Sequence, residues 1–144
     1  MSLRIGPTAL LCELPRRIGA RAGELGRIGE ELAARSIAGT GRRVLARRLR
    51  VASVEVDLLV RDRRGLALVE VKSGRIGPRF RPGHRLEREQ LERLHRAAAW
   101  LRRRSGIPAR VELFEVLFDS EGRFLQCIDH DELTHSPPPL PGIR

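Results

Sequence analysis

Aromatic side chains are scarce in this chain of 144 residues, which has four Phe, one Trp and no Tyr. Proteins that bind single-stranded nucleic acid usually stack successive bases on rows of aromatic rings. The shortage of rings therefore argues against that class. Cysteine is scarce as well, because Cys12 and Cys127 are the only two and lie far apart in the sequence. They form no CxxC metal motif and no disulfide framework, so we expect a reducing compartment.

Long apolar runs are also missing. The stretch 9–12 near the N-terminus stops at Glu13 and is too short for the apolar region of a signal peptide. No segment reaches the length that spans a bilayer. The sequence thus predicts a cytoplasmic protein with no membrane partner.

Lysine is nearly absent, although the chain is strongly basic. Of 28 basic residues, 27 are Arg and only Lys72 is Lys, and against 18 acidic residues they leave a net charge of +10. Such a charge favours a polyanionic partner, and backbone contacts to duplex or branched DNA fit it best. Lys72 is a candidate site residue, because the pKa of a lysine moves readily on burial whereas an arginine stays charged. The alternative is that one lysine survived by chance.

The chain divides into an N-terminal extension over 1–18, a domain over 19–135 and a Pro-rich tail over 136–144. Within the domain the hydrophobic periodicity predicts helix, three strands, helix and two strands, over 20–38, 42–51, 53–60, 66–72, 91 to about 105, 111–118 and 123–128. The run 111–118 is apolar on both faces, which indicates a central buried strand. We expect an α/β fold in which helices flank a mixed central sheet. The polar segment 129–135 predicts a solvated loop.

The strands 53–60 and 66–72 predict a hairpin with its turn at Arg63 and Arg64. Regular alternation of side chains places the apolar residues of the first arm on one face, namely Val54, Val56, Leu58 and Val60. The opposite face then carries charged side chains of both arms.

In this register Asp57 faces Glu70, and Glu55 faces Lys72. Like charges directly opposite each other destabilise a sheet, so the two carboxylates indicate a bound cation, for which Mg²⁺ with its oxygen ligands is the natural choice. Lys72 would then stand beside the metal and orient a water or a phosphate oxygen. The alternative is a solvated hairpin in another register, with a surface pair between Glu55 and Lys72.

These residues resemble a known family. Asp57, followed after twelve residues by Glu70-Val71-Lys72, resembles the PD-(D/E)XK signature of restriction-endonuclease-like nucleases. Four blocks, 26–33, 55–59, 69–72 and the helix 90–101, resemble the bacterial YraN family, which is distantly related to archaeal Holliday-junction resolvases. The resemblance covers about residues 20–130 and implies a restriction-endonuclease-like core.

The resemblance implies roles for four residues. Asp57 and Glu70 would bind Mg²⁺, with Mn²⁺ as a substitute, and Lys72 would assist the attacking water. Glu30 on the first helix would complete the catalytic and metal site. Helical spacing places Glu30 on one side with Ala33, Ala34 and Ile37, against the body of the protein, although a plain surface glutamate fits the periodicity equally well.

Two positions depart from the family pattern. Val54 stands where the family usually has Gly, and Gln90 stands where it usually has Lys, which puts a direct charge role at that place in doubt. We expect the nucleic-acid contacts at Gln90, Arg47, Arg48 and Arg75. A solvated charged face is the alternative for each arginine.

Together these features predict a Mg²⁺-dependent endonuclease that hydrolyses DNA phosphodiester bonds, with branched or junction DNA as a candidate substrate. The alternative is a nucleic-acid-binding protein that keeps the nuclease fold without turnover, and a basic RNA-associated protein would have no metal site at all. The sequence leaves open the substrate structure and whether two chains pair as a homodimer.

Overall fold

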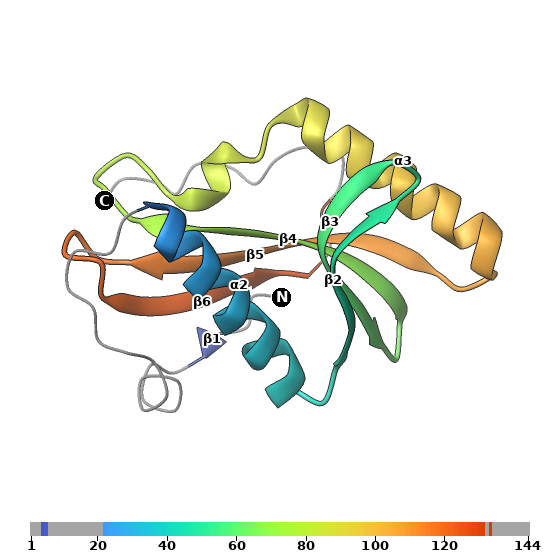
Figure 1. Ribbon diagram of the computed structural model, residues 1–144, viewed down its shortest axis with the longest axis horizontal. Coiled ribbons are helices and arrows are strands. Elements are labelled where there is room, and N and C mark those ends of the chain that lie inside the picture. The colour runs from blue at the N-terminus through green and yellow to red at the C-terminus, as the bar shows by residue number, and fades with distance from the viewer. Residues whose placement is uncertain (1–3, 6–21, 132, 134–144) are drawn as a thin grey trace.

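A computed structural model describes residues 4–5, 22–131 and 133 of the chain. Most of the predicted extension and all of the Pro-rich tail lie outside these residues. The two long helices, α2 (Ala22–Gly39) and α3 (Arg88–Ser105), flank a six-stranded sheet (Figure 1). No helix among the described residues has the length and apolar character needed to cross a membrane.

The sheet has the strand order β1-β6-β5-β4-β3-β2. Its strands are β1 (Arg4–Ile5), β2 (Arg43–Val51), β3 (Val54–Asp62), β4 (Gly65–Arg75), β5 (Ala109–Phe118) and β6 (Phe124–His130). β4 and β5 pair in parallel and the other neighbours are antiparallel. The parallel pair needs a crossover, which the 3₁₀-helix η1 (Pro82–Arg85) and α3 provide. The predicted α/β class, the mixed sheet and the element order are therefore confirmed, and β1 is an additional edge strand.

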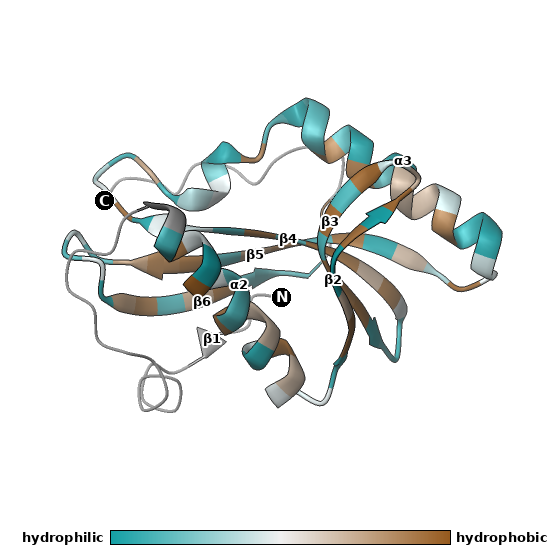
Figure 2. Cartoon of the chain, in the orientation of Figure 1, coloured by the Kyte–Doolittle hydropathy of each residue, from teal (hydrophilic) through white to brown (hydrophobic). Residues whose placement is uncertain are grey.

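Two apolar cores lie on opposite faces of the sheet. Successive residues of β4 point alternately into the two cores. Ala67 and Val69 belong to the core with α2, and Leu66 and Leu68 belong to the core with α3. Figure 2 shows the apolar colouring concentrated along the strands and on parts of the two helices. β5 is central in the sheet, as predicted, and pairs on both sides.

Helix α2 lies close to β4. A side chain at Gly29 would clash with Ser73, and the Ser73 hydroxyl donates a 3.1 Å hydrogen bond to the carbonyl oxygen of Leu25. The turn of α2 that contains Glu30 therefore lies beside the end of β4 that carries Lys72.

The β3–β4 hairpin has the predicted register. Leu58 pairs with Val69 and Asp62 with Gly65, around a two-residue turn at Arg63 and Arg64. Pairing ends at Leu58 and Val69, so Asp57 and Glu70 stand just beyond the last pair of the ladder.

The alternation predicted for β3 is wrong at Asp57. Val56 belongs to the core under α3, whereas Leu58 belongs to the core under α2. The partner strand β2 has a left-handed residue at the same level, Arg48, with φ of 49°. Two-stranded ribbons twist more than wide sheets, and here the twist moves the outer half of the β2–β3 ribbon toward α3 (Figure 1).

Candidate active site

Asp57 and Glu70 form the centre of the candidate site. The backbone N–H of Val71 donates a 2.8 Å hydrogen bond to Oδ2 of Asp57, which fixes this carboxylate against β4. The sequence correctly predicts that the two acidic side chains come together.

Burial and the nearby Glu70 charge raise the pKa of Asp57 from 3.8 to about 7. The hydrogen bond from Val71 and the charge of Lys72 act in the opposite direction but do not offset these effects. Near neutral pH, the protonated and the charged forms of Asp57 are therefore both populated. A cation bound beside it would favour the charged form.

Lys72 and Gln90 both contact one oxygen of Glu70. Nζ of Lys72 lies 3.0 Å from Oε1 of Glu70, and Nε2 of Gln90 donates a 2.8 Å hydrogen bond to the same atom. Lys72 thus pairs with Glu70, while Glu55 is exposed on β3. Gln90, which we expected at a phosphate, instead holds a carboxylate, a contact between α3 and β4 that no local sequence pattern predicts.

Glu30 reaches the same region from α2, and its negative charge contributes to the raised pKa of Asp57. Its carboxylate is bound by Arg48, whose Nε and Nη2 lie 3.0 and 2.8 Å from Oε2. The neighbouring Arg47 makes a similar pair with Glu31, at 2.6 Å. Two of the arginines expected to contact nucleic acid are therefore ion-paired with α2. The third, Arg75, is the last residue of β4 and is partly buried.

The donor set fits a hard divalent cation held by two side chains. Within the described part of the chain, no three acidic, histidine or cysteine side chains are arranged to hold a metal ion together. Asp57 and Glu70 nevertheless each have an oxygen that accepts no hydrogen bond from a described residue, Oδ1 and Oε2. Mg²⁺ commonly binds through one or two carboxylates and takes its remaining ligands from water and phosphate. The site therefore suits a metal that binds together with a phosphate.

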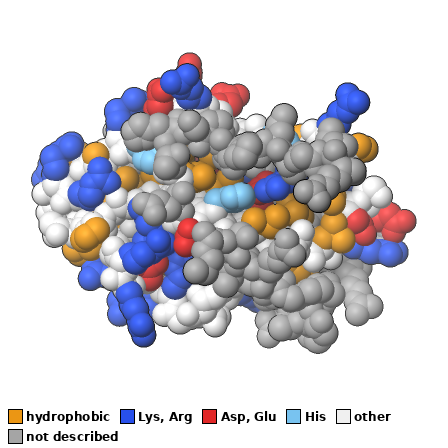
Figure 3. Space-filling view, turned by 180° about the vertical axis from the view of Figure 1, so that it is seen from behind, with side chains coloured by type: hydrophobic (Ala, Val, Ile, Leu, Met, Phe, Trp, Pro, Cys, Tyr) orange, Lys and Arg blue, Asp and Glu red, His pale blue; other side chains and the backbone are white. Residues whose placement is uncertain are grey.

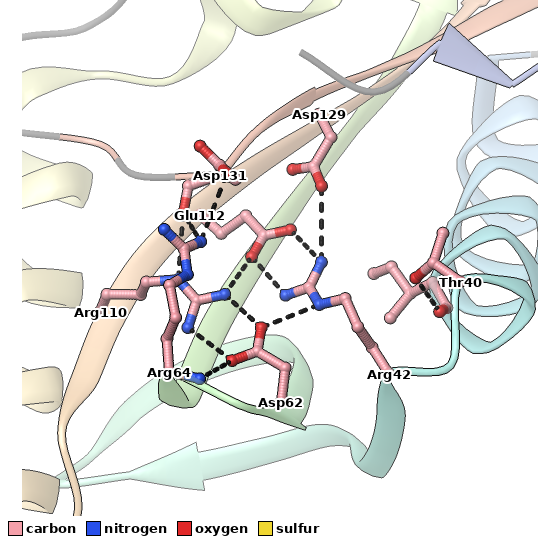
Figure 4. Close-up of polar contacts among 9 residues, drawn as sticks. Thr40, Arg42, Asp62, Arg64, Arg110, Glu112, Asp129 and Asp131 are labelled. Carbon is pink, nitrogen blue, oxygen red and sulfur yellow. Dashed lines mark hydrogen bonds and ion pairs between the residues drawn. The ribbon is translucent and has the colours of Figure 1, made fainter. Parts of the chain in front are cut away.

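Two buried ionic networks, both centred on β5, are not predicted from the sequence. The run 111–118 contains two charged residues, Glu112 and Glu115, and both are 0% exposed. Arg42 donates to both carboxylate oxygens of Glu112, at 2.8 and 2.6 Å, and Asp62, Arg110 and Asp129 complete this network (Figure 4). Isolated glutamates inside an apolar run were the available signal.

The prediction of a solvated loop is wrong at Asp129, which lies on β6 and is buried. Burial and its hydrogen bond with Glu112 raise the pKa of Asp129 to about 8. Oδ1 of Asp129 is buried and has no hydrogen-bond partner among the described residues. In its protonated form Asp129 can donate a hydrogen bond to Glu112.

The second network fixes the segment that follows β4. Glu115 accepts hydrogen bonds from the Gly83 N–H at 2.8 Å and from Arg81, and Nε2 of His130 lies 2.8 Å from Oε2. These contacts lower the pKa of Glu115 to about 2 despite its burial. β4 extends to Arg75, past the strand end predicted at residue 72, and these contacts of Arg81 and Gly83 anchor the segment around η1 on β5.

The matching family model and the similar curated proteins carry the same family description. The family model described as "Uncharacterised protein family UPF0102" matches residues 29–120. A UPF0102 protein of Streptomyces coelicolor is 37% identical over 105 residues, which are 69% of this chain and 81% of that protein. A UPF0102 protein of Symbiobacterium thermophilum is 36% identical over 107 residues, or 72% of this chain and 89% of that protein. The solved structure of Pyrococcus furiosus SfsA in complex with Ca²⁺ aligns with 70% of this chain and 62% of its own, at a TM-score of 0.38 and 14% identity.

Proposed function

This chain belongs to the UPF0102 family, and we propose that it is a Mg²⁺-dependent endonuclease that hydrolyses phosphodiester bonds in DNA. The family match agrees with the resemblance to YraN proteins seen in the sequence. The nuclease activity, the Mg²⁺ and the DNA substrate are what we propose beyond the family membership.

The observation that carries the proposal is the pair formed by Asp57 and Glu70. Glu70 is buried with Asp57 partly buried beside it, and burial together with the charge of Glu70 raises the pKa of Asp57 to about 7. Lys72 is the single cation within ion-pair distance of Glu70 among the described residues, and none is that close to Asp57. A buried acidic pair with so little compensation is unfavourable for folding, which is typical of a site that binds a cation.

The residues divide the work as follows. Asp57 and Glu70 would hold the metal, which when bound supplies a Lewis acid for the phosphate and lowers the pKa of a bound water. The Val71 N–H and the Gln90 amide hold these two carboxylates in place. Lys72, which is only 18% exposed, can donate to a water or to a phosphoryl oxygen at the edge of the acidic pair.

The basic surface supports DNA as the substrate. Figure 3 shows several basic side chains at the left end of that view and others at its edges, and the chain has a net charge of +10. Arginines bind phosphates through two parallel hydrogen bonds, and the small number of aromatic rings favours contacts to the backbone over base stacking. Branched DNA is the substrate class that the YraN resemblance suggests.

A purely binding protein is the weaker alternative. Phosphate binding gains nothing from buried carboxylates, which repel the backbone. A chain that had lost turnover would be expected to replace Asp57 or Glu70 with a neutral residue, because the change would relieve their repulsion.

The test is incubation of the purified chain with labelled linear, flapped and four-way DNA, with Mg²⁺ or with EDTA. We expect strand cleavage only with Mg²⁺ and none by Asp57→Asn under the same conditions. Binding of these DNAs should weaken steeply with added salt, because neutralised phosphates release counterions. Salt-sensitive binding with no cleavage of any substrate would support the non-catalytic alternative instead.

A further inference from the structure

Arg48 occupies an unusual backbone position at the edge of the candidate site. Its φ of 49° lies in the left-handed region, which residues with a Cβ adopt infrequently. It stands where the β2–β3 ribbon twists, between the pairs Arg47 with Leu58 and Leu49 with Val56. This is the level of Asp57 on the partner strand. Such conformations are retained when the surrounding structure requires them, and they concentrate at functional sites.

The guanidinium of Arg48 is both engaged and accessible. It donates two hydrogen bonds to Oε2 of Glu30, at 3.0 and 2.8 Å, yet its side chain is 58% exposed. The hydrogen bonds and the charge of Glu30, and to a smaller extent the charges of Asp57 and Glu55, raise the pKa of Arg48. Arg48 is therefore a cation within reach of the acidic site and also of a ligand in solvent.

We propose that Arg48 is a latch that couples DNA binding to metal binding: it holds Glu30 in the free protein and exchanges this carboxylate for a backbone phosphate when DNA binds. The exchange replaces one bidentate ion pair with another of the same kind, because a guanidinium forms two parallel hydrogen bonds with either a carboxylate or a phosphate. Glu30 would then be available to the metal held by Asp57 and Glu70. This inference rests on the proposed function and explains why Glu30 stands near the two carboxylates but is paired elsewhere.

Arg47 provides a matched control. It lies next to Arg48 on β2, is similarly exposed at 52%, and also pairs with a glutamate of α2. Its partner is Glu31, which is not among the main causes of the raised pKa of Asp57, whereas Glu30 is. Removing Arg47 thus deletes the same charge and the same type of pair without releasing Glu30.

The experiment is calorimetric titration of the full chain with Mg²⁺ and with Mn²⁺ in the absence of DNA. We expect Arg48→Ala to tighten metal binding by about 5-fold or more, a typical size of coupling between two sites, and Arg47→Ala to leave it nearly unchanged. Arg48→Gly should behave like Arg48→Ala, and it guards against a folding defect because glycine accepts the left-handed backbone.

The variant Arg48→Ala in a Glu30→Gln background separates the latch from a general charge effect. If the gain in affinity acts through Glu30, it disappears in this background. A gain that persists there, or an equal gain in Arg47→Ala, overturns the latch and leaves the nuclease proposal intact. Failure of the parent chain to bind either metal would instead reject the proposed function itself.

Discussion

Gln90 and Glu70 join helix α3 to strand β4 within the candidate site. The Gln90 side-chain amide donates a 2.8 Å hydrogen bond to Oε1 of Glu70, the oxygen that also faces Lys72. Both donors therefore act on one oxygen and leave Oε2 of Glu70 for another ligand. Residues that orient a ligand side chain in this way commonly matter for metal affinity as much as the donor chemistry does.

This contact predicts that Gln90→Ala weakens Mg²⁺ binding by about 10-fold, the lower end of the usual effect of removing such a support. The measurement is calorimetric titration with Mg²⁺, with the stability of the variant checked by thermal unfolding. Glu89→Ala is the control, because Glu89 is exposed on the same turn of α3. Equal affinities in the parent and both variants would show that Gln90 does not position Glu70.

The acidic pair predicts a pH dependence of stability in the metal-free protein. Because the pKa of Asp57 is raised from 3.8 to about 7, the folded state keeps a proton that the unfolded chain releases. The contribution of Asp57 to stability is therefore full below 3.8 and is lost as the pH rises through about 7. Asp57→Asn removes this loss, and its carbonyl can still accept from Val71. We expect the variant to be more stable by about 1–3 kcal/mol at pH 8.

Chemical denaturation at several pH values measures this difference. Mg²⁺ should stabilise the parent chain and have no effect on Asp57→Asn, because binding to the folded state alone raises its stability. A variant that binds Mg²⁺ with the affinity of the parent would rule out Asp57 as a ligand.

The register of the site could be predicted from the sequence because two signals agree. The apolar alternation of both arms and the Arg63-Arg64 turn together fix the pairing of Leu58 with Val69. A shift by one residue would have exposed the apolar face. Asp57 and Glu70 come directly after this pair, so the sequence predicts that they are neighbours, but it does not predict the twist that changes the alternation of β3 at Asp57.

Contacts between distant segments could not be predicted in the same way. Glu112 is neutralised by Arg42, 70 positions away, and Glu70 is held by Gln90, 20 positions away on another element. The partner of Glu30 depends on the twist at Arg48, which places that guanidinium over α2. Such pairings depend on how the helices dock and how the ribbon twists, which hydrophobic periodicity does not encode.

The buried network around Glu112 predicts a second pH effect, in a higher window. The pKa of Asp129 is raised from 3.8 to about 8, so its protonated form stabilises the folded state and this contribution is lost as the pH rises through about 8. Asp129→Asn keeps a donor for Glu112 without a proton to lose. Between about pH 7 and about pH 9 the melting temperature of the parent should fall more than that of the variant.

Asp131→Asn is the control for this effect. Asp131 lies two residues away and pairs with Arg64 at 3.3 Å, but its side chain is 30% exposed. Its charge contributes less to the raised pKa of Asp129 than burial and Glu112 do, so Asp131→Asn should change the fall in melting temperature between about pH 7 and about pH 9 much less than Asp129→Asn does. Parallel curves for the parent and Asp129→Asn would mean that Asp129 is charged in the folded protein.

Lys72 is the point at which composition and geometry lead to the same residue. It is the one lysine among 28 basic residues, and its Nζ lies 3.0 Å from Glu70 at the edge of the acidic pair. Lys72→Arg keeps the charge, so a residue that serves only as an ion-pair partner or a phosphate contact should tolerate the change. If Lys72 orients or deprotonates the attacking water, the larger guanidinium, which stays protonated, can do neither. We then expect single-turnover cleavage of a DNA substrate to slow by about 100-fold or more, the usual effect of losing an acid–base group, while DNA affinity in EDTA changes little. Cleavage by Lys72→Arg at the rate of the parent would withdraw the catalytic role of Lys72 and leave it as a charge that balances Glu70.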